Sequence, residues 1–515
     1  MNYRIDHGWT ITALIVSLMS LPASAQAVER FVCDMNQLED AIAAAKPGDE
    51  IVMCNGDWRD AHIELDVDGT VSDPIRLRAE TPGQVRLLGS SDMRLGGSYA
   101  VVDGLVFTGR YTGPDGNRVI QFRIGLGREC NHCRVTNLAF IDYNNNENEQ
   151  LKWITLFGQY NRVDHSYFSG KSNRGAMVQV LRQTNDPDYH RIDHNFFSRP
   201  TMDFPNGGEA VQVGVSGRLA DADSATTVDN NYFFRADGDP EIISNKSSGN
   251  VYRHNTFVES QGALTLRQGH RVTIDGNYFF GGGVALTSGV TILGDSHTII
   301  NNYFFNLNPT NYHRLGGIVM GTADDKIDPQ KGWYDLPRVR NVLIAHNTIL
   351  GTEQSLLYKE SRDNGFGNVK PTGVRIINNI ISAPGKDLIE DRINLADVEY
   401  AGNVFDGNVD SAVSSGGNIT RNPRLQESGD SVFRPGSDSP AIDAAVELST
   451  VTHDIDDQRR RGSSDIGADE FSNGGSMRAP IGLCDVGPTS FRPGLKAACT
   501  NTATRPAPPQ FLTIS

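Results

Sequence analysis

The chain has 515 residues and a formal net charge of −15 at pH 7, with 38% hydrophobic and 21% charged residues. This is the composition of a folded protein and excludes a disordered one, and the acidic balance argues against nucleic acid as a partner. The 53 glycines, abundant asparagine and lack of long runs rich in Leu, Ala, Glu and Lys indicate many turns and little helix.

Residues 1–27 have the pattern of a secretory signal peptide. Arg4 precedes the apolar run TITALIVSLMSL, and ASAQA at 23–27 offers small residues for cleavage. The run is too short to span a membrane, and no later segment is long enough. We expect export, to the periplasm or medium, with a mature chain beginning near Gln26 or Val28; an uncleaved membrane anchor is the alternative.

The six cysteines fall into three local pairs. An exported protein keeps disulfides, so local pairing is the simplest expectation, although six cysteines allow 15 connectivities. The motif CNHC at 130–133 resembles half of a zinc site without a second half nearby, so a disulfide or free thiols are favoured over a metal. The expected pairs are Cys33–Cys54, Cys130–Cys133 and Cys484–Cys499.

A short motif, Asn followed by aromatic or aliphatic residues after a β-rich run, recurs along residues 195–403. Successive intervals are 36, 24, 22, 25, 45, 32 and 24 residues, as expected for a unit of 22–25 residues with inserted loops; RVDHSYF at 162–168 is a variant. The repeat asparagines are Asn195, Asn231, Asn255, Asn277, Asn302, Asn347, Asn379 and Asn403.

This period predicts an all-β solenoid, a single-stranded parallel β-helix. Each unit is too short to contain a normal helix, strands of successive coils would lie about 4.8 Å apart, and Phe, Tyr, Ile and Val would fill the interior. Asparagine suits a turn with left-handed backbone, and its side chains can hydrogen-bond from coil to coil. A β-sandwich array or a propeller is the alternative, but propeller repeats are usually longer.

The expected domain plan has a catalytic β-helix at 28–471 and a tail at 472–515. QLEDAIAAAKPGDEIVM at 37–53 predicts a short N-terminal capping helix followed by the first strand, since terminal coils must be covered. Residues 439–445 and 454–471 are expected to be the closing coils. The tail is rich in Gly, Ser and Pro and should be loosely structured apart from a local disulfide.

The repeat also predicts where charged side chains meet. Four of them lie 10 to 15 positions after the asparagine of their own coil, namely Glu209, Glu241, Lys246 and Arg267. Asp239 and Glu241 share one side of a strand, and Asn206 with Glu209 would come from the coil before. Such a cluster of oxygen ligands suits Ca²⁺; on composition alone, a solvated ladder of ion pairs is the favoured alternative.

An ordered set of motifs resembles polysaccharide lyase family six, which contains alginate lyases and chondroitinase B. The resemblance spans roughly residues 29–470, and none of its motifs is specific alone. The motifs are CNGDWRD (54–60), NGGE (206–209), DPEIISNKS (239–247), RQGHR (267–271) and HRLGG (313–317).

The resemblance implies a right-handed parallel β-helix that cleaves an anionic uronic-acid polysaccharide by β-elimination. It implies Lys246 as catalytic base, Arg267 as catalytic acid, and Asp239 and Glu241 as calcium carboxylates. It adds Asn206 as the amide ligand and Glu209 as a further or indirect ligand. On the substrate side it places Gln268, His270, Arg271 and Arg314.

Two positions depart from the family pattern. Gln268 stands where His often follows the catalytic Arg, and Thr291 stands where Arg is common, so the substrate subclass is the least secure implication. With a net charge of −15 and few spare arginines to contact sulfate, alginate is favoured over dermatan sulfate. Mannuronate or guluronate preference, exo or endo action and oligomeric state do not follow from the sequence.

The expected chemistry explains the residue types. Removing the C5 proton of a uronate builds negative charge on its carboxylate, which bound Ca²⁺ would neutralise. Neighbouring positive charge would favour a neutral, basic Lys246, whereas Arg is a poor proton donor, so Arg267 would act mainly through its charge. The alternatives are a β-helical glycoside hydrolase using Asp237, Asp239 and Glu241, and a uronan-binding protein without activity.

Overall fold

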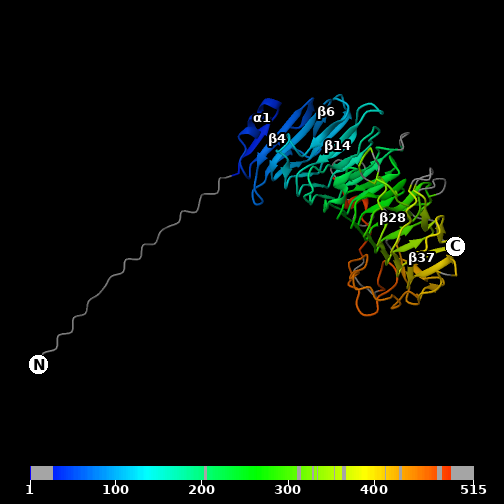
Figure 1. The fold of residues 1–515 in the computed structure, drawn as a ribbon. Helices are drawn as coiled ribbons and strands as arrows, with labels where there is room; N and C mark the ends of the chain where they lie inside the picture. Colours follow the sequence, from blue (N-terminus) through cyan, green and yellow to red (C-terminus); the bar gives the residue numbers. More distant parts are fainter. Residues whose placement is uncertain are drawn as a thin grey trace.

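The computed structural model describes residue 1 and residues 27–201, 206–309, 315–327, 330–332, 334–352, 354–361, 367–411, 413–428, 432–471 and 478–488. In this part of the chain, strands stack into three long parallel sheets, and successive strands of the solenoid pass from one sheet to the next (Figure 1). The fold is the expected parallel β-helix.

Each sheet takes one strand from nearly every coil. The first sheet contains β1 (Glu29–Val32), β2 (Glu50–Met53), β5 (Ile75–Ala79), β8 (Ala100–Asp103), β12 (Arg134–Thr136), β15 (Arg162–Asp164), β18 (Arg191–Asp193), β21 (Thr227–Asp229), β24 (Val251–Arg253), β27 (Thr273–Asp275), β30 (Thr298–Ile300), β33 (Leu343–Ala345), β36 (Val374–Ile377) and β39 (Val398–Ala401).

The second sheet contains β11 (Cys130–Asn131), β7 (Asp92–Ser98), β10 (Asn117–Gln121), β14 (Leu151–Leu156), β17 (Val178–Val180), β20 (Val211–Gly214), β23 (Glu241–Lys246), β26 (Gly262–Gln268), β29 (Thr287–Ile292), β32 (Ile318–Gly321), β35 (Leu356–Lys359) and β38 (Ile389–Asp391), with β4 (His62–Asp68) paired to β7.

The third sheet contains β3 (Gly56–Arg59), β6 (Val85–Leu88), β9 (Leu105–Arg110), β13 (Ala139–Asn144), β16 (Tyr167–Ser169), β19 (Phe196–Arg199), β22 (Tyr232–Ala236), β25 (Thr256–Val258), β28 (Tyr278–Phe280), β31 (Tyr303–Phe305), β34 (Thr348–Leu350), β37 (Ile380–Asp387), β40 (Val404–Asn408) and β41 (Ile419–Thr420).

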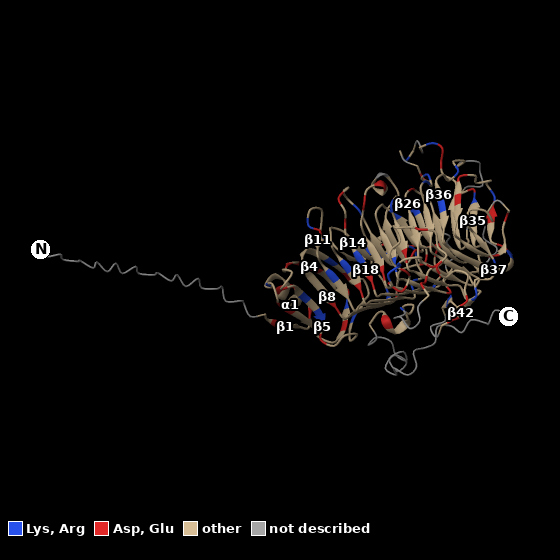
Figure 2. Ribbon diagram, turned by 90° about the horizontal axis from the view of Figure 1, so that it is seen from below, with Lys and Arg blue, Asp and Glu red and all other residues tan. Residues whose placement is uncertain are grey.

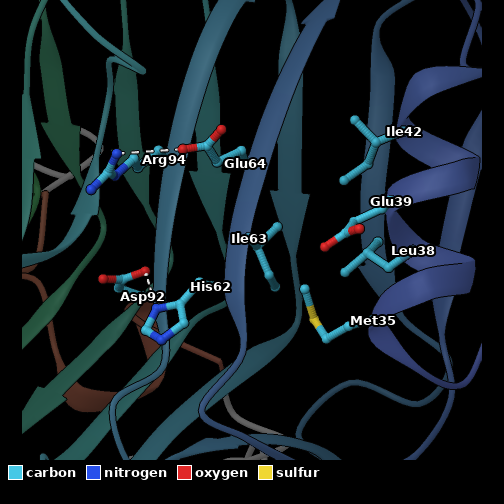
Figure 3. A pocket seen from close by; sticks show the side chains of 9 residues that line it. All are labelled: Met35, Leu38, Glu39, Ile42, His62, Ile63, Glu64, Asp92 and Arg94. Atoms are coloured by element: carbon cyan, nitrogen blue, oxygen red, sulfur yellow. Dashed lines mark hydrogen bonds and ion pairs between the residues drawn. The ribbon is translucent and has the colours of Figure 1, made fainter. Parts of the chain in front are cut away.

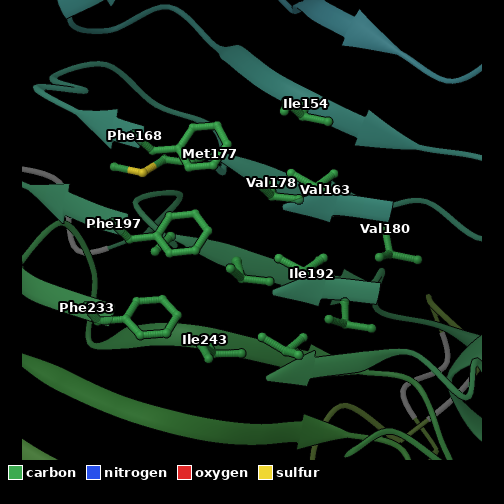
Figure 4. Close-up of a cluster of buried hydrophobic side chains, with 14 of the residues drawn as sticks. Ile154, Val163, Phe168, Met177, Val178, Val180, Ile192, Phe197, Phe233 and Ile243 are labelled. Carbon is green, nitrogen blue, oxygen red and sulfur yellow. The ribbon is translucent and has the colours of Figure 1, made fainter. Parts of the chain in front are cut away.

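Stacked side chains fill the interior. Phe168, Phe197 and Phe233 lie one above the other, with ring centroids 5.0 and 4.9 Å apart, and they face Ile and Val side chains of the other sheets (Figure 4). The parallel register repeats the same residue type at the same place in each coil, so identical rings meet face to face. This core fixes the coil spacing on which the site depends.

The repeat asparagines form a buried ladder. Asn277, for example, donates to Asn302 Oδ1 at 2.9 Å, while its own Oδ1 accepts from the backbone N–H and the side chain of Asn255. The expected left-handed backbone is instead at the residue before each ladder position, such as His194 and Asn230. The ladder side chain must point inward, and the preceding residue therefore makes the turn.

Charged side chains are paired along the first sheet. Figure 2 shows basic and acidic residues interleaved on the strands around β8 and β18. Arg162 donates to Asp193 at 2.6–2.7 Å and Arg191 to Asp229 at 2.8–2.9 Å, one coil to the next. The carboxylates are buried, and each is satisfied by a guanidinium on an adjacent strand.

The N-terminal end is capped as expected, with one difference in order. Helix α1 (Met35–Ala43) begins at Asp34, whose side chain accepts from Gln37 N, and it buries Leu38 and Ala41 against the end of the core. The first strand is β1, before the helix, whereas the sequence predicted the first strand after it. The disulfides Cys33–Cys54 and Cys130–Cys133 are present as predicted.

The C-terminal segment does not stack as closing coils. The strands β42 (Leu425–Glu427) and β43 (Phe433–Pro435) form an antiparallel pair. After them the chain runs back along the outside of the third sheet (Figure 1). Phe433 N donates to Tyr303 OH, and Gly487 N donates to His194 O. The returning segment covers aromatic side chains that point outward from the third sheet, and the repeat spacing does not predict such a cover.

Two expectations about the chain ends fall on undescribed residues. The signal peptide lies almost wholly in 2–26, and Cys499 lies in 489–515, so the signal and the third disulfide stay predictions. The part of the tail that is described, 478–488, includes a 3₁₀ turn, η2 (Leu483–Asp485), and contacts the solenoid. No helix among the described residues is long and apolar enough to cross a membrane.

Candidate active site

A cavity of about 480 Å³ lies over the outer face of the second sheet. β23 and β26 supply its central charged residues, and the neighbouring strands and their loops supply the walls. Its described lining comprises Asn206, Ser216, Asp239, Pro240, Glu241, Lys246, Thr265, Arg267, Thr291, Leu293, Leu315, Gly321, Leu336, Lys359 and Ser361. Five of the residues predicted for catalysis and metal binding therefore share one cavity.

Two local features bring these residues together. The register between β23 and β26 shifts twice, so Asn245 pairs with Leu266 and Lys246 with Gln268, leaving Arg267 as the extra residue of a bulge. A bulge re-aims side chains and is common beside active sites. As a result Lys246 and Arg267, from successive coils, both face the cavity.

The motif NGGE approaches the next coil closely because its second glycine has no side chain. A Cβ on Gly208 would lie 1.9 Å from the carbonyl oxygen of Gly238. The close approach lets Gly208 N donate to Asp239 Oδ2 at 3.1 Å. The glycine pair thus places Asn206 and Glu209 beside the carboxylates of the following coil.

Lys246 faces Glu209, with Nζ 3.6 Å from Oε1 and both side chains largely buried, at 14% and 5% exposure. Arg267 lies between two carboxylates: its Nε is 3.9 Å from Glu241 Oε1, and its Nη2 is 3.7 Å from Asp335 Oδ2. Both cations are therefore held by acids at the cavity wall, and the looser distances around Arg267 leave its donors available to a ligand.

Asp239 is a buried carboxylate among other carboxylates. Burial, reinforced by the negative charge of Glu209, raises the pKa of Asp239 to about 7, although Gly208 N and Glu241 N both donate to it. Ser244 Oγ donates to Glu241. A cation bound at this cluster would relieve the repulsion between the acids, and a hard ion is the natural partner of such oxygen donors.

The donor set is mixed. No group of three or more His, Cys, Asp or Glu in the described part of the chain has the arrangement of a complete metal centre. Asp239, Glu241 and the amide of Asn206 nevertheless line one cavity, and all three donors are oxygen. These residues therefore fit a hard cation that draws its remaining ligands from water and substrate.

Comparison with known proteins places this chain in a family. The sequence model of the chondroitinase B family matches residues 32–445. The chain belongs to the chondroitinase B family, polysaccharide lyase family six. No curated protein sequence matches it.

Solved structures of family-six enzymes resemble this chondroitinase B family member. The alginate lyase AlyGC is 31% identical over 90% of this chain, with a TM-score of 0.76, and this chain spans 59% of the length of AlyGC. A mannuronic acid specific family-six lyase from human gut microbiota is 28% identical over 75% of this chain and 88% of its own, with a TM-score of 0.67.

The remaining substrate-side predictions have different surroundings in this family member. Gln268 is buried; it accepts from Gly217 N at 3.1 Å and donates to the carbonyls of Tyr334 and Asp335. Gln268 therefore links two loops beside the cavity through hydrogen bonds, and it is not among the described cavity residues. Thr291, the second departure from the family pattern, does line the cavity.

His270 and Arg271 lie beyond Gly269, where the chain turns toward the first sheet with φ 92°. His270 Nε2 is 3.3 Å from Asp221 Oδ1, and Arg271 donates to Asp223 at 2.8 Å. Neither is among the described cavity residues. Arg314 lies outside the described residues.

The sequence analysis missed two charged residues at the site. Lys359, at the end of β35, lines the cavity and donates to Glu360 O at 2.9 Å. Asp335 contacts Arg267 and Lys331, at 3.7 and 3.4 Å. Asp335 lies inside the 45-residue interval of the repeat, where an inserted segment breaks the spacing used to align charges. Lys359 lies 12 residues after Asn347, the same offset as Arg267 from Asn255, so the spacing could have found it.

A second cavity, of about 400 Å³, lies between α1 and β4 (Figure 3). Met35, Leu38 and Ile42 form its apolar side, and His62 pairs with Asp92 at 3.0 Å across from them. It contains none of the residues predicted for catalysis or metal binding, so the cavity over β23 and β26 is the candidate active site.

Proposed function

We propose that the protein is a polysaccharide lyase that cleaves alginate by β-elimination. The observation that carries this proposal is the shared cavity: a lysine, an arginine and an oxygen-rich cluster meet on one face of a β-helix. The alginate lyase AlyGC, at 31% identity, supports the reaction class and the substrate.

Lys246 acts as the base in this mechanism. Its Nζ in the neutral form takes the C5 proton of a uronate. The C4–O bond then breaks, a C4=C5 double bond forms, and the leaving oxygen receives a proton from solvent water. Glu209, 3.6 Å from Nζ, holds the amine in position and is an acceptor for the proton that Lys246 must later release. Arg267 supplies positive charge to the leaving oxygen.

Asn206, Asp239 and Glu241 would hold Ca²⁺, with Glu209 as a further or indirect ligand. Bound there, the ion would neutralise the uronate carboxylate and so acidify the C5 proton. The protein's own part is to gather these oxygens and to hold Asp239 through Gly208 N and Glu241 N. Thr265 and Ser216 supply neutral hydrogen-bonding groups in the same cavity for sugar hydroxyls.

Alginate is proposed over dermatan sulfate because the cavity has few groups for sulfate. Arg267 is the one arginine among its described lining residues, and Lys246 and Lys359 are the other cations. Arg267 already faces Glu241 and Asp335. Paired hydrogen bonds to a sulfate would need additional guanidinium groups.

The test of the reaction is product analysis with and without calcium. A lyase leaves an unsaturated sugar that absorbs ultraviolet light; chelation should abolish its release, and added calcium should restore it. Products lacking that absorbance would instead show a hydrolase, and binding without shortening would show a carbohydrate-binding protein. Undiminished turnover after thorough chelation would refute the calcium role.

The proposed location is outside the cytoplasm. Two disulfides, Cys33–Cys54 and Cys130–Cys133, suit an oxidising compartment, and so does a polymeric substrate. Detecting the processed chain in periplasm or medium, with an N-terminus near Gln26 or Val28, would test this.

A further inference from the structure

Two cations of the second sheet lie directly opposite each other without an acid between them. Arg118 on β10 and Lys152 on β14 are partners in the parallel register. Like charges on adjacent strands repel. On the first sheet Arg162 also lies opposite Arg191, but each of these arginines is paired with an aspartate of an adjacent strand, Arg162 with Asp193 and Arg191 with Asp229.

Neither side chain of this basic pair, Arg118 and Lys152, makes an ion pair or a hydrogen bond within the described residues, and the buried Nε of Arg118 has no partner. Glu209 and Asp115 act on Lys152 only through their charge, without a direct contact. Arg123 adds a third positive charge: its Cζ lies 3.9 Å from the ring centroid of Phe157, and that of Arg118 lies 6.0 Å away. Burial and the neighbouring guanidinium lower the pKa values of Arg118 and Lys152.

The basic pair is in line with the active site. Leu151 N donates to Arg174 O and Met177 N donates to Glu209 O, so Lys152, Ala176 and Glu209 occupy one column across β14, β17 and the chain entering β20. Two strand spacings separate Lys152 from Glu209, roughly 10 Å, and Arg118 lies one spacing farther. The residue between them, Ala176, is small and buried, at 1% exposure.

Resting on the proposed function, we propose that Arg118 and Lys152 form a distal binding subsite for carboxylates of the uronan chain, two to three sugar units from the catalytic cluster. A hexuronate unit is about as long as one strand spacing, so a chain lying across the strands presents carboxylates at matching intervals. Arg123 strengthens the positive potential from behind. The subsite makes the enzyme favour long chains over short ones.

Repulsion between Arg118 and Lys152 destabilises the protein when no substrate is bound. Uncompensated, partly buried charge costs stability, and a bound polyanion relieves that cost. If Arg118 and Lys152 bind substrate, removing their charges should leave the stability of the free protein unchanged or raise it. If they have a purely structural role, removing them should lower its stability. Measuring both binding and stability therefore distinguishes a binding role from a structural one.

The experiment compares the double variant Arg118→Gln/Lys152→Gln with the parent, using oligouronates of three and of eight or more units. Calorimetry on a Lys246→Ala background measures affinity without turnover. We expect about tenfold weaker binding of the long oligomer in the double variant, unchanged binding of the trimer, and a melting temperature that is unchanged or higher. Lys152→Arg should bind like the parent.

Arg375→Gln is the matched control, since Arg375 is an exposed arginine of the first sheet paired with Glu399 at 2.9 Å. It should bind both oligomers like the parent. Equal losses for long and short oligomers, or no loss, would overturn the subsite. A protein that cleaves no uronan would refute the proposed function alone, because the calorimetry on long oligomers would still decide whether the basic pair binds them.

Discussion

Lys246 is held in place before any substrate arrives. Glu209 lies 3.6 Å from its Nζ, and the bulge at Arg267 puts the second cation into the same cavity. Asp239 is fixed by two backbone N–H groups. Under the proposed function, such preorganisation by neighbouring backbone and acids would let the neutral amine of Lys246 act on a weakly acidic C5 proton.

Lys246→Ala and Arg267→Ala should each lose activity by about 10²–10⁴-fold, because each removes a group used in the bond-making steps. Both residues face the cavity and not the core, so circular dichroism should show an intact fold. Arg235→Gln serves as the control, since Arg235 pairs with Glu259 on the third sheet. A variant of either residue that kept more than about a tenth of parent turnover would show that its assigned role is wrong.

At the residue scale, sequence spacing predicted most of the site. Counting from the repeat asparagines placed Glu209, Glu241, Lys246 and Arg267 in one sector, and their distances agree. The same counting cannot show which way a side chain faces after a corner. Gly269 turns the chain, so His270 and Arg271 meet Asp221 and Asp223.

At the scale of elements, the asparagine ladder should contribute strongly to stability. Asn277→Ala removes a fully buried amide that donates to Tyr252 O and Asn302 Oδ1 and accepts from Asn255 N. We expect a loss of about 2–4 kcal/mol in the free energy of unfolding, since several buried groups lose their partners. Denaturant titration measures it.

Asn418→Ala is the comparison for that variant, because Asn418 ends the ladder and is only partly buried. Asn418→Ala should lower the free energy of unfolding clearly less than Asn277→Ala does. Equal losses at the two positions would mean that the ladder contributes through local turn geometry and not through hydrogen bonds between coils.

Buried histidines at coil corners should make the fold sensitive to acid. Burial lowers the pKa of His190 to about 3 and of His297 to about 4. Because these values lie below the usual 6.5, each neutral imidazole contributes stability that is full above pH 6.5 and is lost as pH falls toward the folded pKa. At pH 5 the loss should be about 2 kcal/mol for each histidine.

His297→Asn tests this directly. Asn161 occupies the equivalent corner, accepting from Cys133 N and donating to Phe157 O, as His297 accepts from Val272 N and contacts Leu293 O. The variant should fold and should lose less stability than the parent between pH 7 and pH 5. An unchanged slope of stability against pH would contradict the proton linkage.

For the whole molecule, the repeat predicted the solenoid but not what covers it. The asparagine motif and its aromatic neighbours specify each coil, and the family resemblance agreed. The backward course of residues 432–471 could not be predicted, because it depends on outward side chains such as Tyr278 and Tyr303 that need a cover. Lys359, by contrast, keeps the repeat spacing, 12 residues after Asn347 as Arg267 is 12 after Asn255, so the same counting could have found it.

The central claim is that this cavity performs calcium-assisted elimination on alginate. The most direct measurement is a side-by-side assay of poly-mannuronate, poly-guluronate and dermatan sulfate at equal calcium, following ultraviolet absorbance of unsaturated ends. The account predicts rapid absorbance growth on at least one alginate block, slower growth on dermatan sulfate, and none after chelation. Faster cleavage of dermatan sulfate would contradict the substrate, and chain shortening without new absorbance would contradict the elimination itself.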